Sequence, residues 1–465
     1  MKDILVKDIL EICKDAKLIC GNQNTICRNF SKDTRTIQKD DVYIGIKGER
    51  FDGNQLYKEA IKNGASVCIL QDVKISEQEK EQYKYTSIIL VEDTIKTLQE
   101  IAKKKRNMYN IPVIAITGSV GKTSTKDIIA NVMAKQFHIL RTEGNLNNHI
   151  GLPLTILKLK DEEMLIVEMG MNQAGEIKRL TEIAKPDVAV ITNVGTAHIG
   201  NLGTRENILK AKLEILEGLS KDGVVIINND NDMLHKWYEE NCKKESQKII
   251  TYGIYQKSDV QAKNTELKED ESTFLAVYKD KEIKIEVPIA GEHFVYNALC
   301  ATAIAENYGI EEQKIQKGIK EFELSKKRME TYQIGKYTII NDCYNANYDS
   351  MKAAIEHLGN TKKETKIAIL GDMLELGEYS EELHRKVGEE IQKNKINIVI
   401  TVGFFSKYIN QMAKNSKNVH CETKEEAVEV AKKLMKPNTS ILIKASNSMK
   451  FDEIANQLIE YLKSL

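Results

Sequence analysis

Residues 116–125 read ITGSVGKTST and decide the fold of the middle of the chain, because they lie between an apolar run, PVIAIT, and a helix-like run, STKDIIANVMAKQF. A complete phosphate-binding loop reads GxxxxGK[ST], and Ile116 stands where that pattern has its first glycine. The shorter core from Gly118 to Thr123 keeps two glycines, a lysine and a threonine in the right order. This strand, loop and helix predict a nucleotide-phosphate site; the alternative is a chance glycine-rich turn.

Each residue type in this loop suits the binding of phosphate for a chemical reason. Glycines let backbone N–H groups curl toward phosphate oxygens, and the following helix adds the positive end of its dipole. We expect Lys122 to reach the β and γ phosphates and the Thr123 hydroxyl to hold Mg²⁺. The expected phosphate-binding residues are Gly118, Ser119, Gly121, Lys122, Thr123 and Ser124.

A carboxylate for the metal is available on another predicted strand. The run MLIVEMG places Glu168 at the carboxyl end of an apolar strand, where it would face the loop. The alternative is an ordinary acid at the end of a strand. The patterns DxxG and NKxD, which GTPase switches need, do not occur in the sequence, and this argues against a nucleotide-dependent switch.

Length, charge and cysteine usage set the broad class of protein. At roughly 100–200 residues per domain, 465 residues suggest about three domains. Lysine plus arginine equals aspartate plus glutamate, at 68 each, so no net field favours nucleic acid or an acidic membrane. The eight cysteines form no CxxC pair, which fits free thiols in a reducing cytosol. No apolar run approaches the ~18 residues of a membrane span, so we expect a cytoplasmic protein without membrane insertion.

Strand and helix patterns divide the chain into three α/β domains. Residues 1–105 carry VYIGIKG, SVCIL and SIILVED, and end in a charged helix. Residues 106–326 carry PVIAIT, MLIVEMG, PDVAVITNVG and GVVIINND, continuous apolar strands that predict a parallel sheet, and an antiparallel hairpin within 249–290. Residues 327–465 carry YTIIND, KIAILGD, INIVITVG and TSILIKAS, which predict a second doubly wound, Rossmann-like sheet.

One lysine falls on the apolar face of a predicted helix. At 100° per residue from Ile208, the apolar side chains as far as Leu219 share one face, and Lys212 lies near its middle. Because a buried ammonium is costly, Lys212 either snorkels, pairs with a buried acid, or faces the phosphate site and serves the reaction. His198, in the turn NVGTAHIG after an apolar strand, is either a turn residue or a metal ligand.

Six segments together resemble the Mur ligases: TGSVGKTSTK, RTEGNLNNHIGLPLTIL, EMGMNQAGEI, TNVGTAHIGNLGTRENILKAKLEI, YNANYDSMKAAI and GDMLELGEYSEELHRKVG. The segment SKDTRTIQKDDVYIGIKGERFDGNQ resembles the family's UDP-binding domain, so the likeness covers essentially the whole chain. The resemblance implies a UDP-muramoyl-peptide-binding domain (1–105), a central P-loop-type ATP-binding ligase domain (106–326) and a Rossmann-like C-terminal domain (327–465) that closes on the site.

The resemblance also implies an amide ligase of peptidoglycan synthesis. ATP would phosphorylate the terminal carboxylate of UDP-N-acetylmuramoyl-tripeptide, and the amine of D-alanyl-D-alanine would then expel phosphate from the acyl phosphate. Within the family, GDMLELGEYS is the segment most specific to the member with these substrates. The implied cofactors are ATP and two Mg²⁺ ions, and we expect a monomer.

The resemblance assigns roles residue by residue. The implied catalytic residues are Lys122, Lys212 and His198. The implied metal ligands are Thr123, Glu168, His198 and a carbamylated Lys212. The further ATP contacts are Asn297, at adenine, with Arg328 and Asp342. The substrate residues are Asp33, Thr34 and Arg35 at the UDP-sugar peptide, and Asn345, Asn347 and Ser350 near the dipeptide.

Two positions depart from the family's usual pattern. Tyr348 stands where YNANPDSM has proline, and Asn447 stands where an arginine usually follows K-[GA]-S. Tyrosine frees the backbone φ and enlarges the side chain, while losing the arginine removes a bidentate grip on a carboxylate or phosphate. Both lie in the third domain and concern the amino acceptor, so the alternatives are a paralogue with altered dipeptide specificity or a nucleotide-binding protein without ligase activity. A related Mur-type or folylpolyglutamate-type ligase is a further alternative, which GDMLELGEYS and the N-terminal domain disfavour.

Overall fold

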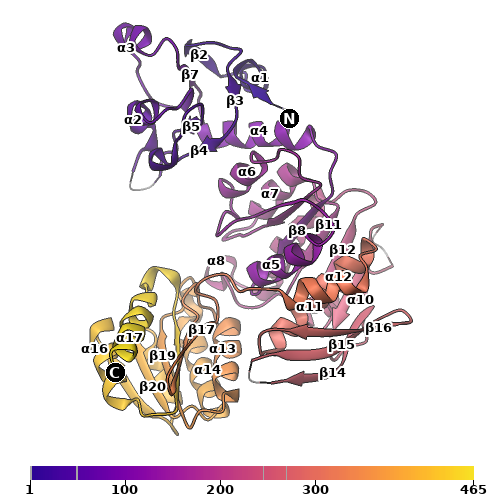
Figure 1. Cartoon of the computed structure of the whole chain (residues 1–465), viewed down its shortest axis with the longest axis vertical. Coiled ribbons are helices and arrows are strands. Elements are labelled where there is room, and N and C mark those ends of the chain that lie inside the picture. The colour runs from indigo at the N-terminus through magenta and orange to yellow at the C-terminus, as the bar shows by residue number, and fades with distance from the viewer. Residues whose placement is uncertain (1–2, 49–50, 244–245, 269) are drawn as a thin grey trace.

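The computed structural model describes residues 3–48, 51–243, 246–268 and 270–465 and shows three lobes along the long axis of the molecule (Figure 1). The indigo N-terminal lobe and the yellow C-terminal lobe lie at opposite ends, with the central lobe between them. Each lobe is built around its own sheet with parallel strands. The predicted α/β class with parallel sheets is therefore confirmed.

The N-terminal sheet has the strand order β2-β7-β6-β5-β4, in which β2 runs antiparallel to β7 and the other neighbours are parallel. Its apolar strands are buried, and the three that the sequence predicts are confirmed as β5, β6 and β7. The elements of this lobe are β1 (Ile4–Leu5), α1 (Val6–Ile12), β2 (Lys17–Cys20), β3 (Ile26–Cys27), β4 (Phe30–Ser31), η1 (Thr34–Thr36), β5 (Val42–Ile44), η2 (Gly53–Leu56), α2 (Tyr57–Lys62), β6 (Val67–Leu70), α3 (Glu77–Gln82) and β7 (Ser87–Leu90).

The charged helix α4 (Thr94–Asn107) joins the first two lobes. Asp93 caps its N-terminus by accepting from two backbone N–H groups, which satisfies donors that an uncapped helix leaves open. Its apolar side packs on the central lobe, where the Gln99 amide donates to the backbone of His149 and the Arg106 guanidinium donates to Ala184. The helix therefore anchors the N-terminal lobe to the central one.

The central sheet has the order β16-β15-β14-β13-β12-β11-β8-β10-β9. Its strands from β9 to β13 are parallel and apolar, as the sequence predicts, because helices cover both faces. The antiparallel part is wider than the expected hairpin: β14, β15 and β16 pair antiparallel, whereas β13 still pairs parallel with β14. The strands are β8 (Val113–Thr117), β9 (Ile139–Arg141), β10 (Met164–Glu168), β11 (Val188–Ile191), β12 (Val224–Asn228), β13 (Lys248–Gly253), β14 (Val260–Leu267), β15 (Ser272–Tyr278) and β16 (Lys281–Val287).

The register of three neighbouring strands places the site. Ile116 of β8 pairs with Glu168 of β10, and Thr117 pairs with Ile191 of β11. The carboxyl ends of these strands therefore meet at one edge, where parallel sheets bind ligands. The helices of this lobe are α5 (Lys122–Met133), α6 (Gly151–Ile156), α7 (Glu176–Ala184), α8 (Ile199–Leu202), α9 (Arg205–Leu213), η3 (Glu214–Gly218), α10 (Asp232–Asn241), α11 (Glu292–Asn307) and α12 (Glu312–Lys320).

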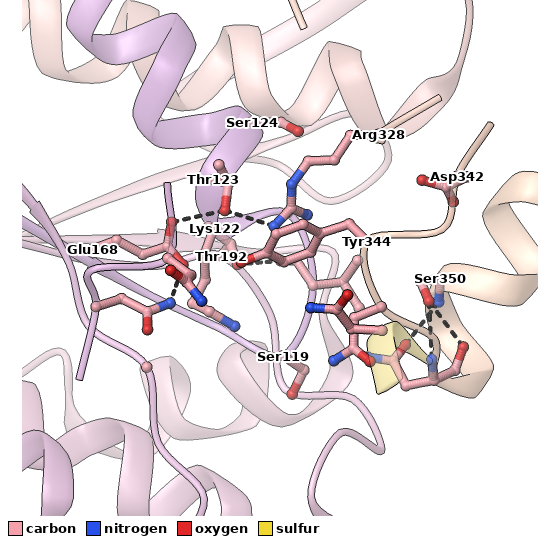
Figure 2. A pocket seen from close by; sticks show the side chains of 18 of the residues that line it. Ser119, Lys122, Thr123, Ser124, Glu168, Thr192, Arg328, Asp342, Tyr344 and Ser350 are labelled. Carbon is pink, nitrogen blue, oxygen red and sulfur yellow. Dashed lines mark hydrogen bonds between the residues drawn. The ribbon is translucent and has the colours of Figure 1, made fainter. Parts of the chain in front are cut away.

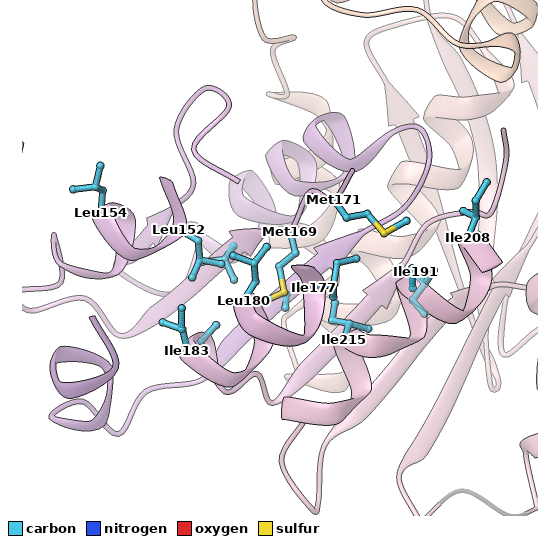
Figure 3. Packing of buried hydrophobic residues seen from close by; sticks show 14 of the residues in the cluster. Leu152, Leu154, Met169, Met171, Ile177, Leu180, Ile183, Ile191, Ile208 and Ile215 are labelled. Atoms are coloured by element: carbon cyan, nitrogen blue, oxygen red, sulfur yellow. The ribbon is translucent and has the colours of Figure 1, made fainter. Parts of the chain in front are cut away.

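A layer of buried apolar side chains fixes the helices beneath this edge (Figure 3). Leu180 and Ile183 of α7 and Ile215 of η3 pack with Ile191 of β11 in that layer. Fully burying one such side chain stabilises the fold by about 1.5–3 kcal/mol. This layer holds α7, α9 and η3 against the sheet and so fixes the positions of the polar groups at the site.

The C-terminal sheet has the order β17-β18-β22-β19-β20-β21, with β17 antiparallel and the rest parallel. The four strands predicted from the sequence are confirmed as β18, β19, β20 and β22. The elements are β17 (Glu330–Ile334), β18 (Tyr337–Asn341), α13 (Tyr348–Asn360), β19 (Thr365–Gly371), η4 (Gly377–Tyr379), α14 (Ser380–Lys393), β20 (Ile398–Val402), α15 (Lys407–Met412), β21 (Lys417–Cys421), α16 (Lys424–Leu434), β22 (Thr439–Lys444), η5 (Asn447–Met449) and α17 (Asp452–Ser464).

Candidate active site between the central and C-terminal lobes

A cavity of about 1010 Å³ lies between the central and C-terminal lobes. Its central wall is formed by residues 119–124 of the phosphate-type loop and by Glu168, and its opposite wall by residues that follow β18 and β22. Most predicted site residues line it: Ser119, Gly121, Lys122, Thr123, Ser124, Glu168, His198, Asn297, Arg328, Asp342, Asn345, Asn347 and Ser350. A single cavity therefore collects residues that are more than 200 positions apart in sequence.

The loop has the backbone geometry that requires glycine. Gly118 has φ 154° and Gly121 has φ 81°, both in the region that side chains disfavour. A Cβ on Gly118 would lie 1.9 Å from the Thr192 hydroxyl oxygen, so the loop is pressed against the end of β11. Asn193, which the sequence did not single out, holds the loop by accepting from the N–H groups of Ser119 and Val120 at 3.1 and 2.9 Å.

Thr123 is the centre of a polar chain that crosses the cavity (Figure 2). Its hydroxyl donates to Glu168 Oε2 at 2.8 Å and accepts from Arg328 Nη2 at 2.8 Å. The other Glu168 oxygen accepts from the Asn147 amide at 2.7 Å. Arg328 also stacks on the Tyr344 ring, 3.8 Å from its centroid. The expected pairing of Glu168 with the loop is therefore present, and a cation of the C-terminal lobe already lies beside it.

Lys122 is folded back onto its own loop. Its Nζ donates to the Gly118 carbonyl at 2.7 Å. Burial lowers its pKa, the nearby Arg328 adds to that effect, and Glu168 opposes it. A phosphate group in the cavity would give this ammonium an anionic partner in place of a carbonyl.

Lys212 is buried, as its place on the apolar face predicts, with 1% of its surface exposed. The helix does not continue as expected, because α9 ends at Leu213 and changes to the 3₁₀ turn η3. Burial lowers the Lys212 pKa well below its ordinary value, and the nearby Lys122 lowers it further. Within the described ranges no carboxylate offsets these effects, so pairing with a buried acid does not explain this lysine. Lys212 does not line the cavity, although its charge interacts with that of Lys122 in the phosphate loop.

His198 meets the C-terminal lobe. It precedes α8 with φ 63°, and its Nδ1 lies 2.7 Å from Glu375 Oε2, a residue of the GDMLELGEYS segment. A second contact lies nearby, where Asp349 accepts from the N–H and the hydroxyl of Thr196 at 2.8 and 3.0 Å. The two lobes are therefore docked through the turn that contains His198.

A buried ion pair organises the C-terminal wall. Lys444 Nζ lies 2.6 Å from Asp342 Oδ2 and donates to the Asn345 carbonyl at 2.9 Å. Asp342 Oδ1 accepts from the Met329 N–H. Asn347 and Ser350 cap the first turn of α13 through reciprocal hydrogen bonds. Lys444, 2% exposed, is a site residue that sequence reasoning missed.

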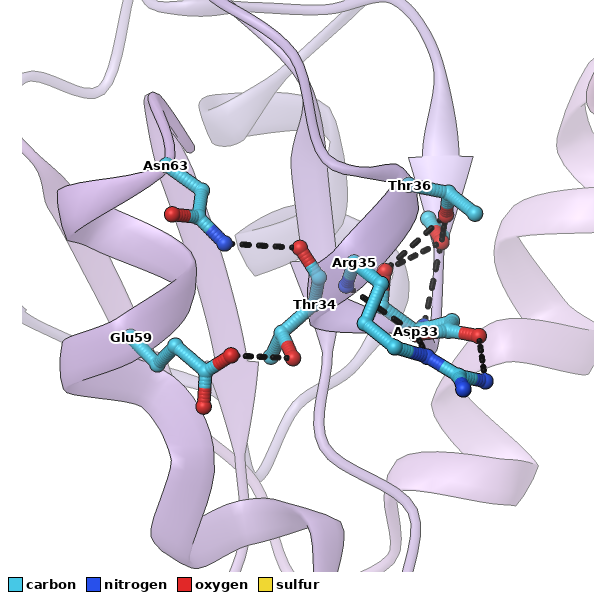
Figure 4. Close-up of polar contacts among 7 residues, drawn as sticks. Asp33, Thr34, Arg35, Thr36, Glu59 and Asn63 are labelled. Carbon is cyan, nitrogen blue, oxygen red and sulfur yellow. Dashed lines mark hydrogen bonds and ion pairs between the residues drawn. The ribbon is translucent and has the colours of Figure 1, made fainter.

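Of the remaining predicted site residues, Asn297 lines the cavity, whereas Asp33, Thr34 and Arg35 lie in the N-terminal lobe. Asn297 accepts from the Thr125 hydroxyl at 2.9 Å and lines the cavity behind Gly121. Asp33, Thr34 and Arg35 lie in the N-terminal lobe, outside this cavity, where Arg35 pairs with Asp33 at 2.7 Å and Thr34 donates to Glu59 (Figure 4). The Arg35 guanidinium lowers the pKa of Asp33 to about 2.

Comparison with known proteins identifies the family. The profile of the Mur ligase middle domain matches residues 116–305, that of the Mur ligase, glutamate ligase domain matches 327–447, and that of the Mur ligase family, catalytic domain matches 29–106. A UDP-N-acetylmuramoyl-tripeptide–D-alanyl-D-alanine ligase of Bacillus subtilis (strain 168) is 37% identical over 464 residues and 98% of each chain. The chain belongs to the Mur ligase family.

Other members agree with this placement. The Escherichia coli (strain K12) protein of the same name is 30% identical to this Mur ligase over 92% of each chain. The crystal structure of MurF from Acinetobacter baumannii superposes with a TM-score of 0.89 at 28% identity, covering 99% of both chains. The MurF ligase of Thermotoga maritima, solved in complex with ADP, gives a TM-score of 0.82 at 26% identity and covers 94% of this chain and 98% of that one.

The two departures from the family pattern lie in different surroundings. Tyr348 is the first residue of α13 and lies outside the cavity lining, with its hydroxyl donating to Glu390 of α14 at 3.2 Å. Asn447, in η5, lines the cavity. Of the two substitutions in this Mur ligase, Asn447 is therefore the one placed to affect a bound substrate.

Proposed function

We propose that this chain joins D-alanyl-D-alanine to UDP-N-acetylmuramoyl-tripeptide at the expense of ATP, in the synthesis of peptidoglycan precursors. A carboxylate oxygen of the tripeptide attacks the γ-phosphorus and ADP leaves, which gives an acyl phosphate. The amine of the dipeptide then attacks the carbonyl carbon, phosphate leaves and the amine loses a proton. ATP is therefore used to activate the carboxylate and is not simply hydrolysed by water. The amide bond forms from this activated acyl group.

The observation that carries the proposal is a pair of hydrogen bonds that connect Arg328, Thr123 and Glu168. It places a phosphate-type loop, a carboxylate and an arginine of the C-terminal lobe in one cavity. Charge that develops on a transferred phosphoryl group is best stabilised by fixed cations and N–H donors. The names of the full-length relatives supply the substrates.

The donor set fits a magnesium ion at one position. Thr123 and Glu168 offer a hydroxyl and a carboxylate oxygen 2.8 Å apart, and hard oxygen donors are what Mg²⁺ prefers. When bound there, Mg²⁺ would neutralise phosphate charge. The protein's part is to hold Glu168 in place. The Asn147 amide donates to one Glu168 carboxylate oxygen, and the Thr142 hydroxyl accepts from the Glu168 backbone N–H.

A second magnesium position needs a modified lysine. The described residues contain no cluster of three or more His, Cys, Asp or Glu side chains suited to a metal. As an ammonium beside Lys122, Lys212 does not fit a cation site. Burial favours its neutral amine, the form that adds CO₂, and the carbamate is an anion. We infer that carbamylated Lys212 and His198 would hold the second ion.

The substrates extend in opposite directions from the phosphate loop. We propose that Asp33, Thr34 and Arg35 contact the UDP-sugar peptide, and that Asn345, Asn347 and Ser350 lie beside the dipeptide. Asn297 would contact adenine, with Arg328 and Asp342 at the phosphates. Within the described residues no helix is long and apolar enough to cross a membrane. We propose that the protein acts in the cytoplasm as a monomer.

Release of phosphate tests the proposal. Purified protein should release phosphate when ATP, Mg²⁺, UDP-N-acetylmuramoyl-tripeptide and D-alanyl-D-alanine are all present, and the product should gain the mass of the dipeptide. Omitting any one substrate should abolish release. If no dipeptide supports release while ATP still binds, the protein is a nucleotide-binding protein without ligase activity.

A further inference from the structure

One of the five lysine and arginine side chains that line the active-site cavity, Lys450, has no partner within the described residues. The other four each have one: Gly118 for Lys122, Asp452 for Lys327, Thr123 for Arg328 and Asp342 for Lys444. Across the ranges that the structure describes, the Lys450 side chain takes part in no ion pair or hydrogen bond. An ammonium in this position is available to an anionic ligand.

The acids that follow Lys450 in the sequence are already paired with other lysines. Asp452 lies 2.7 Å from Lys327, and Glu453 forms an ion pair with Lys424. Both acids line the cavity together with Lys450. Neither carboxylate is therefore left to neutralise the Lys450 ammonium.

The backbone of Lys450 has a conformation that costs energy. Its φ is 54° and its ψ is 45°, in the left-handed region that residues with side chains rarely adopt. Such conformations persist where the surrounding structure enforces them, and they gather at functional sites. Here both flanks are fixed, because the Ser446 hydroxyl accepts the Leu374 N–H at 2.9 Å and Phe451 is buried. The turn between these flanks holds Lys450 at the cavity.

The segment that carries Lys450 is tied to the wall proposed for the dipeptide. Lys444, at the start of the segment, donates to the Asn345 carbonyl at 2.9 Å, and Asn345 is one of the residues proposed to lie beside the dipeptide. The phosphates of ATP, in contrast, have the glycine-containing loop of the central lobe. The position of Lys450 therefore favours an anionic group of the dipeptide over the nucleotide.

We propose that Lys450 binds the C-terminal carboxylate of the dipeptide. The amine at the other end of the dipeptide is the nucleophile, whereas this carboxylate does not react and keeps its charge throughout. A fixed cation would hold it through a charge-assisted hydrogen bond and leave the amine free to attack. Asn447, in the same turn, has no charge to offer, although the family pattern has an arginine there. The inference rests on the proposed function for the identity of the acceptor.

Steady-state kinetics with two acceptors test this role of Lys450. The acceptors are D-alanyl-D-alanine and D-alanyl-D-alanine amide, in which a neutral carboxamide replaces the carboxylate. The wild type should have a KM about 10–100-fold lower for the acid, as the loss of one charge-assisted hydrogen bond predicts. Lys450→Met should raise the KM for the acid about 10–100-fold and leave the KM for the amide unchanged. Lys450→Arg, which keeps a cation, should retain the preference.

Lys395→Met is the matched control. Lys395 is an exposed lysine of the same lobe with φ 53°, and it does not line the cavity, so this substitution should change neither KM. If Lys450→Met raises the KM for both acceptors equally, Lys450 has a structural role and the proposal is wrong. A rise confined to the KM for ATP would assign Lys450 to the nucleotide and would also overturn it.

Binding measurements separate this proposal from the ligase function. Isothermal titration calorimetry of each acceptor, with UDP-N-acetylmuramoyl-tripeptide and a non-hydrolysable ATP analogue present, requires no turnover. If the wild type prefers the acid, Lys450→Met loses that preference and no amide forms, the role of Lys450 stands and the ligase function fails. If amide forms and the preference survives in Lys450→Met, the ligase function stands and the role of Lys450 fails. If the wild type binds neither acceptor, both fail.

Discussion

Arg328 Nη2 donates a 2.8 Å hydrogen bond to the hydroxyl of Thr123, although the two residues belong to different lobes. The same hydroxyl donates to Glu168, so the guanidinium lies where the proposed magnesium ligands meet. Tyr344 supports the guanidinium from one face. Binding of Mg²⁺ and ATP would have to replace this contact, which connects nucleotide binding to the position of the C-terminal lobe.

The Thr123 hydroxyl should be needed, whereas its methyl group should not. Thr123→Val removes both hydrogen bonds, and we expect it to lower the rate of phosphate release about 10²-fold, the usual cost of losing one polar group that stabilises charge in a transition state. Thr123→Ser keeps the hydroxyl and should stay within about fivefold of the wild type. Equal rates for the two variants would show that the hydroxyl has no part in the reaction.

Lys212 should act through a carbamate. Lys212→Arg keeps a positive charge but cannot form the carbamate, so it should lose most ligase activity, as should removal of bicarbonate and CO₂ from the wild type. With ¹³C-bicarbonate, ¹³C NMR should show a carbamate signal that is absent from Lys212→Arg. Unchanged turnover in both the variant and the CO₂-depleted wild type would refute this role.

Dipeptide affinity should depend on Asn447 and not on Tyr348. Asn447 lines the cavity, so Asn447→Arg should lower the KM for D-alanyl-D-alanine about tenfold, as one charge-assisted hydrogen bond would. Tyr348→Phe removes a contact to Glu390 outside the cavity and should leave that KM unchanged. Steady-state kinetics with varied dipeptide distinguish the two, and a larger effect from Tyr348→Phe would contradict the placement of these residues.

His384 should make the C-terminal lobe sensitive to acid. This buried imidazole accepts the Met373 N–H at Nε2, while its Nδ1 faces the Ser380 carbonyl, and burial lowers its pKa. Between the lowered value and the ordinary value near 6.5 the unfolded chain binds a proton that the folded chain does not, so stability falls as pH falls through that window.

A substitution at His384 tests this dependence by thermal unfolding. Between pH 7.5 and pH 5, His384→Gln should lose about 2–4 °C less in melting temperature than the wild type does. His138→Gln, at an imidazole whose side chain is 59% exposed, is the control and should behave like the wild type. If all three proteins lose the same number of degrees, His384 does not set the acid sensitivity.

The sequence predicts those parts of the site that depend on local pattern. The loop from Gly118, the position of Glu168 at a strand end and the burial of Lys212 all follow from periodicity and residue type within a few turns of chain. Three contacts could not be predicted in this way: the Asn193 side chain on the loop, Lys444 on Asp342, and Glu375 on His198. Each depends on how distant strands and lobes are placed, which one sequence does not determine.

The position of the Tyr348 side chain could not be predicted from the sequence either. Tyr348 lies within the motif YNANYDSM, and its departure from the family pattern suggested an altered dipeptide specificity. In the structure its hydroxyl donates to Glu390 of α14, and Tyr348 does not line the cavity. The Asn347 cap explains why α13 begins normally without proline, because its side chain accepts the Ser350 N–H.

Transfer of labelled oxygen tests the central claim most directly. UDP-N-acetylmuramoyl-tripeptide with ¹⁸O in its terminal carboxylate should be converted in the presence of ATP, Mg²⁺ and D-alanyl-D-alanine, and the phosphate released should be analysed by mass spectrometry. An acyl phosphate requires one ¹⁸O atom in each phosphate. Unlabelled phosphate accompanying amide formation would show that the carboxylate is not activated by phosphorylation.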